Sequence, residues 1–154
     1  MVTRPIIVIN GPNLNRLGKR EPEIYGTTTL SEIETMCRET AGDWPMRFHQ
    51  SNLEGDIINW IHEAIDDGAG IIINPAAFSF TSIAILDALK MFPGPIIELH
   101  ITNIHKREAY YHHSLVSKIA TGIMIGFGPM GYSTAVKAML NLLTTNPMTG
   151  GIMK

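Results

Sequence analysis

Short apolar runs alternate with segments of helical periodicity along this chain, and that alternation constrains the fold more than any other feature of the sequence. The apolar runs lie at residues 6–9, 46–50, 70–74, 95–100 and 122–125. Apolar residues at helical spacing follow at 30–43, 56–68, 82–91 and 133–143, with a short helical piece near Leu115. Parallel strands need connections of about this length. The pattern therefore predicts an α/β fold with a doubly wound, five-stranded parallel sheet in three layers.

The chain length of 154 residues fits one domain. We expect a single domain over residues 1–146 and a flexible C-terminal tail over 147–154, where the apolar pattern stops. The 12 basic and 14 acidic residues leave a formal charge of -2, which argues against nucleic acid as a partner. A single cysteine predicts a cytoplasmic setting, and the lack of a long uninterrupted apolar run predicts no membrane association.

In such a sheet, ligands bind beyond the carboxyl ends of the strands. The segment after the first strand carries Arg16, Lys19 and Arg20 ahead of Tyr25, and its glycines and proline predict a long loop of the kind that forms active-site lids. A tyrosine, with an ordinary pKa of about 10, acts as a base near neutral pH only if a cation stabilises its phenolate. Arg20 is placed to do so. The alternative interpretation is a solvated basic loop in which Tyr25 only packs.

The end of the fourth strand offers a second set of reactive groups. Strand alternation puts Glu98, His100 and Thr102 on one side, so that a carboxylate can orient a histidine that acts as a general acid. The alternative is a histidine whose hydrogen bonds are satisfied inside a polar strand end. The adjacent His112 and His113 cannot easily face one ion together, and no cysteine pair accompanies them, so we expect no metal.

Two further segments lie at the ends of predicted strands. Asn74 ends the third strand and is a candidate binding residue, while Thr81 or Ser82 is expected to cap the following helix. Residues 126–131 fit the G-x-G-x-x-G pattern of dinucleotide-binding proteins. That pattern requires an acidic residue about 20 positions later, and none occurs after Glu108. We therefore interpret the glycines as a tight turn with close packing of strand and helix.

Taken together, these motifs resemble those of the type II 3-dehydroquinases. The motifs are residues 10–18, residues 20–26, the pair Asn74-Pro75, residues 98–103, the pair Arg107-Glu108 and residues 126–132. They occur in the family's order, from about residue 5 to residue 143. The resemblance implies a flavodoxin-like domain that needs no metal or organic cofactor, acts on a small carboxylate and forms a homo-oligomer, a dodecamer built as a tetramer of trimers.

The resemblance also implies an activity. The family's enzymes are lyases that remove water from 3-dehydroquinate by anti elimination through an enolate, giving 3-dehydroshikimate in the shikimate pathway of aromatic amino acid biosynthesis or in quinate catabolism. By position, Tyr25 matches the base that removes the C2 proton, and Arg20 matches the group that stabilises its phenolate. Asn13 matches the residue that holds a water beside the enolate. His100 matches the acid that protonates the departing C1 hydroxyl, and Glu98 matches the carboxylate that orients it.

The remaining matches are to substrate-binding positions. Asn74, Thr102 and the backbone near Ile101 match contacts to the substrate and its carboxylate. Arg107 matches an arginine of the lid region, and Asp87 matches a residue that reaches the active site of a neighbouring subunit.

Two positions depart from the family pattern. Phe80 stands where the pattern has a histidine that hydrogen-bonds the substrate, and Tyr111 stands where it has an arginine. We expect both side chains to face the hydroxyls on the ring of the substrate. Exchanging polar contacts for apolar ones there alters substrate preference strongly. Three hypotheses therefore stay open: a 3-dehydroquinate dehydratase, a paralogous hydro-lyase that uses the same chemistry on a different carboxylated hydroxy-ketone, and a non-catalytic family member.

Overall fold

The computed structural model describes residues 3–145, and a parallel sheet of five strands forms its centre. The strands are β1 (Ile6–Asn10), β2 (Met46–Gln50), β3 (Gly70–Asn74), β4 (Ile96–His100) and β5 (Gly122–Ile125). They lie in the order β2-β1-β3-β4-β5, and every neighbouring pair is parallel. This is the flavodoxin-like strand order, so the predicted fold class is confirmed.

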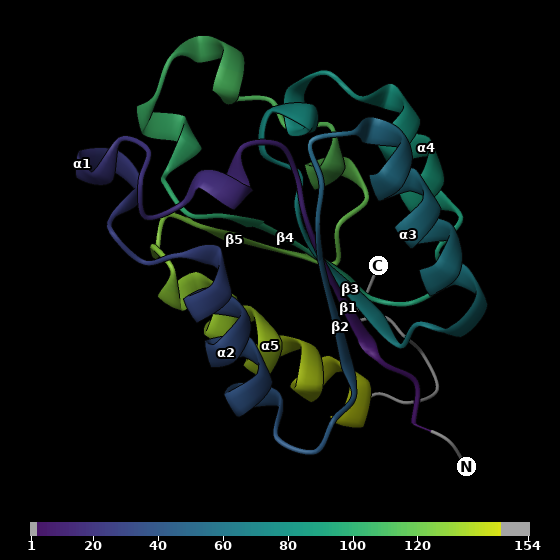
Figure 1. Ribbon diagram of the computed structural model, residues 1–154. Helices are drawn as coiled ribbons and strands as arrows, with labels where there is room; N and C mark the ends of the chain where they lie inside the picture. The colour runs from purple at the N-terminus through teal and green to yellow at the C-terminus, as the bar shows by residue number, and fades with distance from the viewer. Residues whose placement is uncertain (1–2, 146–154) are drawn as a thin grey trace.

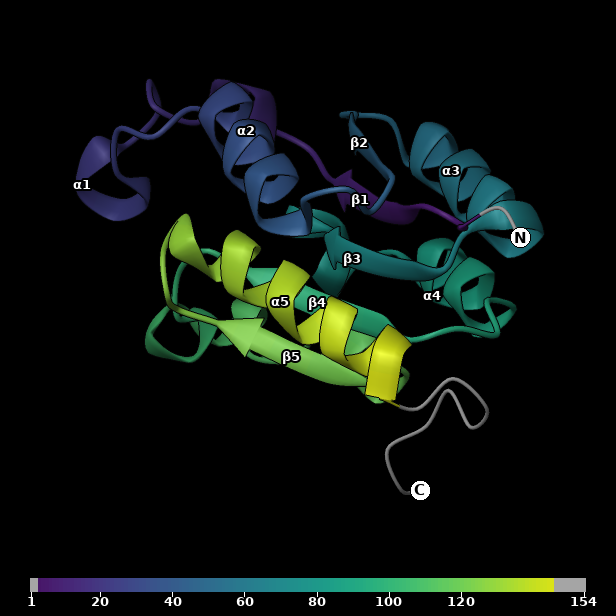
Figure 2. The same ribbon diagram turned by 90° about the horizontal axis from the view of Figure 1, so that it is seen from below.

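Helices cover both faces of the sheet (Figures 1 and 2). The pair α2 (Leu30–Ala41) and α5 (Met130–Thr145) lies on one face, and the pair α3 (Glu54–Asp67) and α4 (Ile83–Lys90) lies on the other. Strand alternation sends Ile6 and Val8 of β1 into the apolar cluster under the first pair, and Ile7 and Ile9 into the cluster under the second. The three predicted layers are present because these strands are apolar on both faces.

Short helical segments occupy the connections between the strands and the long helices. They are η1 (Leu14–Arg16), α1 (Pro22–Tyr25), η2 (Ala76–Phe80), η3 (Ile104–Lys106), η4 (Ala109–Tyr111) and η5 (Val116–Lys118). The predicted lid over residues 10–26 is therefore structured, since Pro22 starts a helical turn and Gly26, with φ of 78°, ends it. The helical piece expected near Leu115 is η5.

The long helices differ from their predicted bounds by a few residues at their ends. The last helix starts at Met130, three residues early, and continues to Thr145. The predicted tail, residues 147–154, lies outside the described residues, and the single-domain assignment over 1–146 stays a prediction. None of the helices between residues 3 and 145 is long and apolar enough to cross a membrane.

Two helix N-termini carry side-chain caps. Thr29 accepts a hydrogen bond from the backbone N–H of Glu32, while the Glu32 carboxylate accepts one from the backbone N–H of Thr29. This capping box starts α2 at Leu30. Ser82 accepts from the N–H of Ile85 and caps α4, so Ser82, and not Thr81, has the predicted role.

The loops after β1 and β3 approach closely at the carboxyl edge of the sheet. The N–H of Gly11 donates to the carbonyl oxygen of Asn74 at 2.8 Å. A Cβ atom at Gly11 would lie 2.3 Å from the carbonyl oxygen of Pro75, so only glycine fits between these two loops. This contact places the ends of two central strands beside each other, where ligands bind in such folds.

Candidate active site

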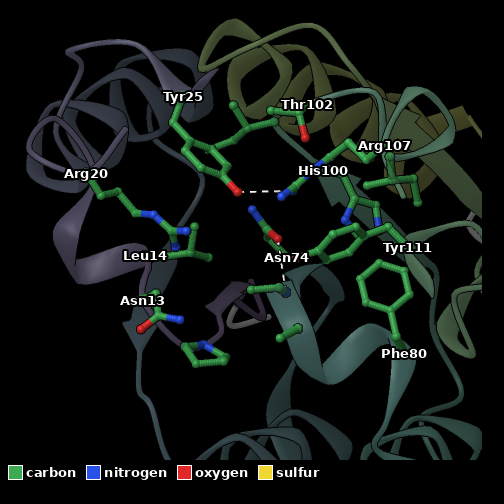
Figure 3. A pocket seen from close by; sticks show the side chains of 15 residues that line it. Asn13, Leu14, Arg20, Tyr25, Asn74, Phe80, His100, Thr102, Arg107 and Tyr111 are labelled. Atoms are coloured by element: carbon green, nitrogen blue, oxygen red, sulfur yellow. Dashed lines mark hydrogen bonds between the residues drawn. The ribbon is translucent and has the colours of Figure 1, made fainter. Parts of the chain in front are cut away.

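A cavity of about 120 Å³ opens at this edge, between the loops that follow β1, β3 and β4 (Figure 3). The predicted site residues that line it are Asn13, Arg20, Tyr25, Asn74, Phe80, His100, Ile101, Thr102, Arg107 and Tyr111. The sequence predicted no site role for the other lining residues, which are Pro12, Leu14, Ala76, Ala77 and Ile104. These are apolar residues or a proline, and no pattern distinguishes them from ordinary core and loop positions.

Two guanidinium groups contact Tyr25. Arg107 donates a hydrogen bond from Nη1 to the phenol oxygen at 3.0 Å. The guanidinium of Arg20 lies over the ring, 4.6 Å from its centroid, and also forms an ion pair with Glu21 at 3.0 Å. The predicted proximity of Arg20 and Tyr25 is present, but the cation at the phenol oxygen is Arg107, which lies 82 positions away in the sequence.

Behind the cavity wall, Glu98 and His100 form a buried pair. His100 Nε2 lies 2.5 Å from Glu98 Oε2, and the Ser117 hydroxyl donates to the other carboxylate oxygen at 2.5 Å. Burial raises the pKa of Glu98, but the hydrogen bond and charge of His100 and the hydrogen bond from Ser117 outweigh it, so the pKa lies below its ordinary value. An ionised Glu98 accepts from an Nε2–H, so the carboxylate orients the imidazole of His100 through that nitrogen.

Ser117 is a residue of this site that sequence reasoning missed. It lies in η5, 19 positions after Glu98. Its hydroxyl bonds to Oε1 of the carboxylate, whereas His100 bonds to Oε2. A serine in a short connection carries no pattern that links it to a strand. Only the fold brings it to Glu98.

Asn74 is almost fully buried, with 4% of its surface exposed, at the centre of the cavity wall (Figure 3). Its Oδ1 accepts from the backbone N–H of Ala76 at 3.2 Å, and its Nδ2 donates to the hydroxyl of Tyr132 at 2.9 Å. Ala76 has a φ of 52°, a left-handed conformation that alanine adopts only at a cost. The strained turn brings that N–H to the amide oxygen.

The glycine motif at residues 126–131 forms a turn that supports the end of β4. Gly126 and Gly128 have φ values of 88° and 65°, which favour glycine. Their N–H groups donate to the carbonyl oxygens of His100 and Ile101 at 3.1 Å and 2.9 Å. The predicted turn is present. At Gly131, however, a Cβ atom would meet its nearest neighbour at 3.6 Å, an ordinary contact, so the expected unusually close packing is not found there.

The two departures from the family pattern form one aromatic wall. The rings of Phe80 and Tyr111 meet edge to face, with centroids 5.3 Å apart, and Phe80 lies 6.2 Å from the ring of His100. The guanidinium of Arg107 stacks on Tyr111, 4.0 Å from its centroid. Tyr111 therefore holds the arginine that contacts Tyr25.

Two predicted residues lie at or beyond the rim of the cavity. Asn13 has a left-handed backbone, with φ of 70°, and its N–H donates to Asn52 Oδ1 at 2.9 Å, so its exposed side chain stands at the rim. Asp87 lies on the exposed side of α4 and does not line this cavity. It borders a separate, shallow hollow near Ile58 and Met91.

Metal ligands are not gathered in the part of the chain that the structure describes. No three His, Cys, Asp or Glu side chains between residues 3 and 145 lie in a group that can hold an ion. The rings of His105 and His112 are 6.0 Å apart at their centroids, and His112 Nε2 bonds to the carbonyl oxygen of Arg107 at 2.6 Å.

The carboxyl edge of this flavodoxin-like sheet carries a phenol, two guanidinium groups and a buried carboxylate–imidazole pair. Together these groups define a pocket for acid–base chemistry on a small anionic ligand. The family model described as dehydroquinase class II matches residues 4–140. This chain therefore belongs to the class II dehydroquinase family, which confirms the resemblance found in the sequence.

Relatives and solved structures agree with the family model. The chain is 53% identical to the 3-dehydroquinate dehydratase of Cereibacter sphaeroides, over 92% of this chain and 97% of that protein. It is 55% identical to the 3-dehydroquinate dehydratase of Bartonella bacilliformis, over 86% and 85% of the two chains. The type II dehydroquinase of Propionibacterium acnes has a TM-score of 0.85 and 44% identity, over 90% and 97% of the two chains.

Proposed function

We propose that this chain is a 3-dehydroquinate dehydratase, a carbon–oxygen lyase that forms 3-dehydroshikimate through an enolate. One observation carries the proposal: a phenol held by a guanidinium and an imidazole held by a buried carboxylate line the same small cavity. Relatives with more than half of their aligned residues identical bear this enzyme's name.

The first step is removal of a proton from C2 by the phenolate of Tyr25. Arg107 stabilises the phenolate at its oxygen, and Arg20 adds positive charge over the ring. The electron pair of the broken C–H bond moves into the enolate of the substrate's ketone. Asn13, at the cavity rim, holds a water that hydrogen-bonds the enolate oxygen.

The second step is loss of the C1 hydroxyl. His100 protonates the departing oxygen, the enolate collapses to the enone, and water leaves. Glu98 stabilises the imidazolium before the transfer and fixes the ring orientation, because it accepts from Nε2 and both side chains are buried. Tyr25, at the end of α1, and His100, at the end of β4, reach the cavity from different elements, which suits an anti elimination in which base and acid act on opposite faces of the ring.

Substrate binding is assigned to the other polar groups of the lining. Asn74, Thr102 and the backbone at Ile101 hold the carboxylate and neighbouring hydroxyls. All proton transfers in this scheme are assigned to side chains, so it includes no metal or organic cofactor. The lone, buried Cys37 agrees with the cytoplasm as the proposed location.

The experiment is an assay of enone absorbance with purified protein and 3-dehydroquinate. We expect the absorbance to rise and the product to match 3-dehydroshikimate by NMR. Substrate stereospecifically deuterated at C2 tests the anti course, because only one of the two labels should be lost. A chain that binds 3-dehydroquinate without forming enone would contradict the proposed activity.

The aromatic wall favours a second candidate, a paralogous hydro-lyase acting on a different carboxylated hydroxy-ketone. Phe80 cannot hydrogen-bond a ring hydroxyl, and Tyr111 carries no fixed charge. The double variant Phe80→His with Tyr111→Arg distinguishes the candidates. Activity on 3-dehydroquinate in the wild type supports the first candidate, whereas an inactive wild type and an active double variant support the second. Inactivity of both proteins would favour a non-catalytic member.

We also propose a homo-oligomer, with the dodecamer of four trimers as its form. Ile83, Asp87 and Met91 lie four residues apart along α4 and just past its end, and so share one face. Ile83 is 70% exposed and Met91 is 56% exposed. Apolar side chains exposed around an acidic residue suit a contact between copies, through which Asp87 reaches a neighbouring cavity.

A further inference from the structure

A buried tyrosine from outside the cavity lining is bonded to its wall. Tyr132, near the start of α5, is fully buried; its hydroxyl donates to Asn10 Oδ1 at 2.7 Å and accepts from Asn74 Nδ2 at 2.9 Å. Asn10 and Asn74 are register partners at the ends of β1 and β3. One hydroxyl thus connects the ends of two central strands to a helix on the face of the sheet.

The direction of each hydrogen bond in this network is fixed by its two ends. At one end, the backbone N–H of Ala76 can only donate, and it donates to Asn74 Oδ1 at 3.2 Å. At the other end, the carbonyl oxygen of His49 can only accept, and it accepts from Asn10 Nδ2 at 3.0 Å. Asn74 must therefore turn its nitrogen toward Tyr132, and Tyr132 must donate to Asn10.

Tyr132 is suited to this position because it stays protonated. Burial raises the pKa of Tyr132, so the hydroxyl keeps its hydrogen over the working pH range. A hydroxyl donates once and still accepts, which the network requires. A phenylalanine at this position would fill the same space and leave Asn10 Oδ1 and Asn74 Nδ2 without their partner.

We propose that Tyr132 is a positioning residue whose hydroxyl fixes the orientation of the Asn74 amide, and so fixes which donor and which acceptor the cavity wall presents to the substrate. Donors that are held in place before the substrate arrives contribute to catalysis without reorganisation during the reaction. The expected loss of kcat/KM rests on the proposed dehydratase function, whereas the fixed orientation of the Asn74 amide does not.

The kinetic test is a double-mutant cycle between Tyr132→Phe and Asn74→Ala, measured by enone formation from 3-dehydroquinate. We expect Tyr132→Phe alone to lower kcat/KM about tenfold, the cost of one misplaced hydrogen bond. In the Asn74→Ala background the same change should cost less than about twofold, because the amide through which it acts is gone. Equal losses in both backgrounds would overturn the proposal.

A matched control separates positioning from loss of stability. Val136 lies one turn further along α5, is fully buried and packs in the same apolar cluster. We expect Val136→Ala to lower the free energy of unfolding and to leave kcat/KM unchanged. If Val136→Ala lowers kcat/KM as much as Tyr132→Phe does, general destabilisation explains the result and the proposal is wrong.

A measurement without substrate keeps the two proposals distinguishable. In NMR spectra of the ¹⁵N-labelled wild type, one side-chain amide hydrogen of Asn74 should exchange slowly with solvent, and Tyr132→Phe should abolish that protection. Slow exchange in a wild type that fails to convert 3-dehydroquinate would reject the dehydratase activity and support the positioning role. Fast exchange of both amide hydrogens in the wild type overturns the positioning role, even if the variant does not fold.

Discussion

At Tyr25, two cations act on different parts of one side chain. Arg107 bonds to the phenol oxygen, where the negative charge of a phenolate is concentrated, and Arg20 lies over the ring while sharing its charge with Glu21. A direct hydrogen bond to the charged form is the stronger of the two influences. The arrangement makes separate predictions for the phenol and for each arginine.

Replacing Tyr25 by phenylalanine should lower kcat by at least about 100-fold, because the ring remains and the proton acceptor is lost. Steady-state rates with 3-dehydroquinate measure the effect. Tyr110→Phe is the matched control, since Tyr110 is 67% exposed and does not line the cavity. Unchanged turnover in Tyr25→Phe would remove Tyr25 from the proposed role of base.

The two arginines should differ in their effect on kcat/KM. Arg107→Lys removes a planar donor from the phenol oxygen, so kcat/KM should fall about tenfold. Arg20→Lys should lower it less, because its guanidinium contacts only the ring. Steady-state rates for the wild type and both variants test this, and a larger loss for Arg20→Lys would contradict it.

The Glu98–His100 pair makes stability depend on pH in the acid range. Although burial opposes it, the hydrogen bonds from His100 and Ser117 hold the pKa of Glu98 below its ordinary value. Glu98 therefore contributes stability above the ordinary glutamate pKa of about 4.3, and the contribution is lost as the pH falls through the lower folded value. Urea unfolding at several pH values should show wild type and Glu98→Gln converging on acidification, whereas a constant difference would contradict the coupling.

At the scale of residues, the sequence predicted contacts between residues that are close along the chain. It missed the contacts that only folding brings about. Glu98 and His100 alternate on one strand, so spacing alone placed them side by side. Tyr25 with Arg107, and Tyr132 with Asn10, are 82 and 122 positions apart. No local periodicity predicts a contact over such a distance in the sequence. The family resemblance named Arg107 but did not supply its contact with the phenol.

At the scale of elements, regular strands and long helices were predictable because each has a pattern that extends over several residues. In the strands it is a continuous apolar run, and in the helices it is a period of 3.6 residues. The isoleucine runs of β1 and β3 and the amphipathic pattern of α3 are examples. The segments η1 and α1 are three and four residues long, too short for any period to appear. Helix ends moved by a few residues because caps such as Gly42 act at a single position.

The junction of β1 and β3 should be intolerant of any side chain at Gly11. A Cβ atom there would lie 2.3 Å from a backbone oxygen, so Gly11→Ala should lower the free energy of unfolding by at least about 2 kcal/mol. Gly55→Ala is the matched control in α3, where a Cβ atom meets nothing within 4 Å, and it should be neutral or stabilising by about 0.5 kcal/mol. Similar losses in the two variants, measured by urea unfolding, would contradict the steric argument.

At the scale of the whole molecule, the position of Asp87 away from the cavity makes a prediction about shared sites. Co-expressed Tyr25→Phe and Asp87→Asn chains should form mixed assemblies in which about a quarter of the sites combine two intact residues from different subunits. Each variant alone should be weakly active, and the mixture should regain activity. No recovery in purified mixed assemblies would show that Asp87 does not act on a neighbouring cavity.

The hydrogen bond between Arg107 and Tyr25 also has a consequence for the order of folding. It joins the loop after β4 to the loop before α2, and in the sheet β3 lies between β1 and β4. The two loops can meet only after β3 has paired with both neighbours. In a refolding chain, helical signal can return with local contacts, but turnover must wait for this long-range pairing. Recovery of activity therefore reports when β3 has paired with both of its neighbours.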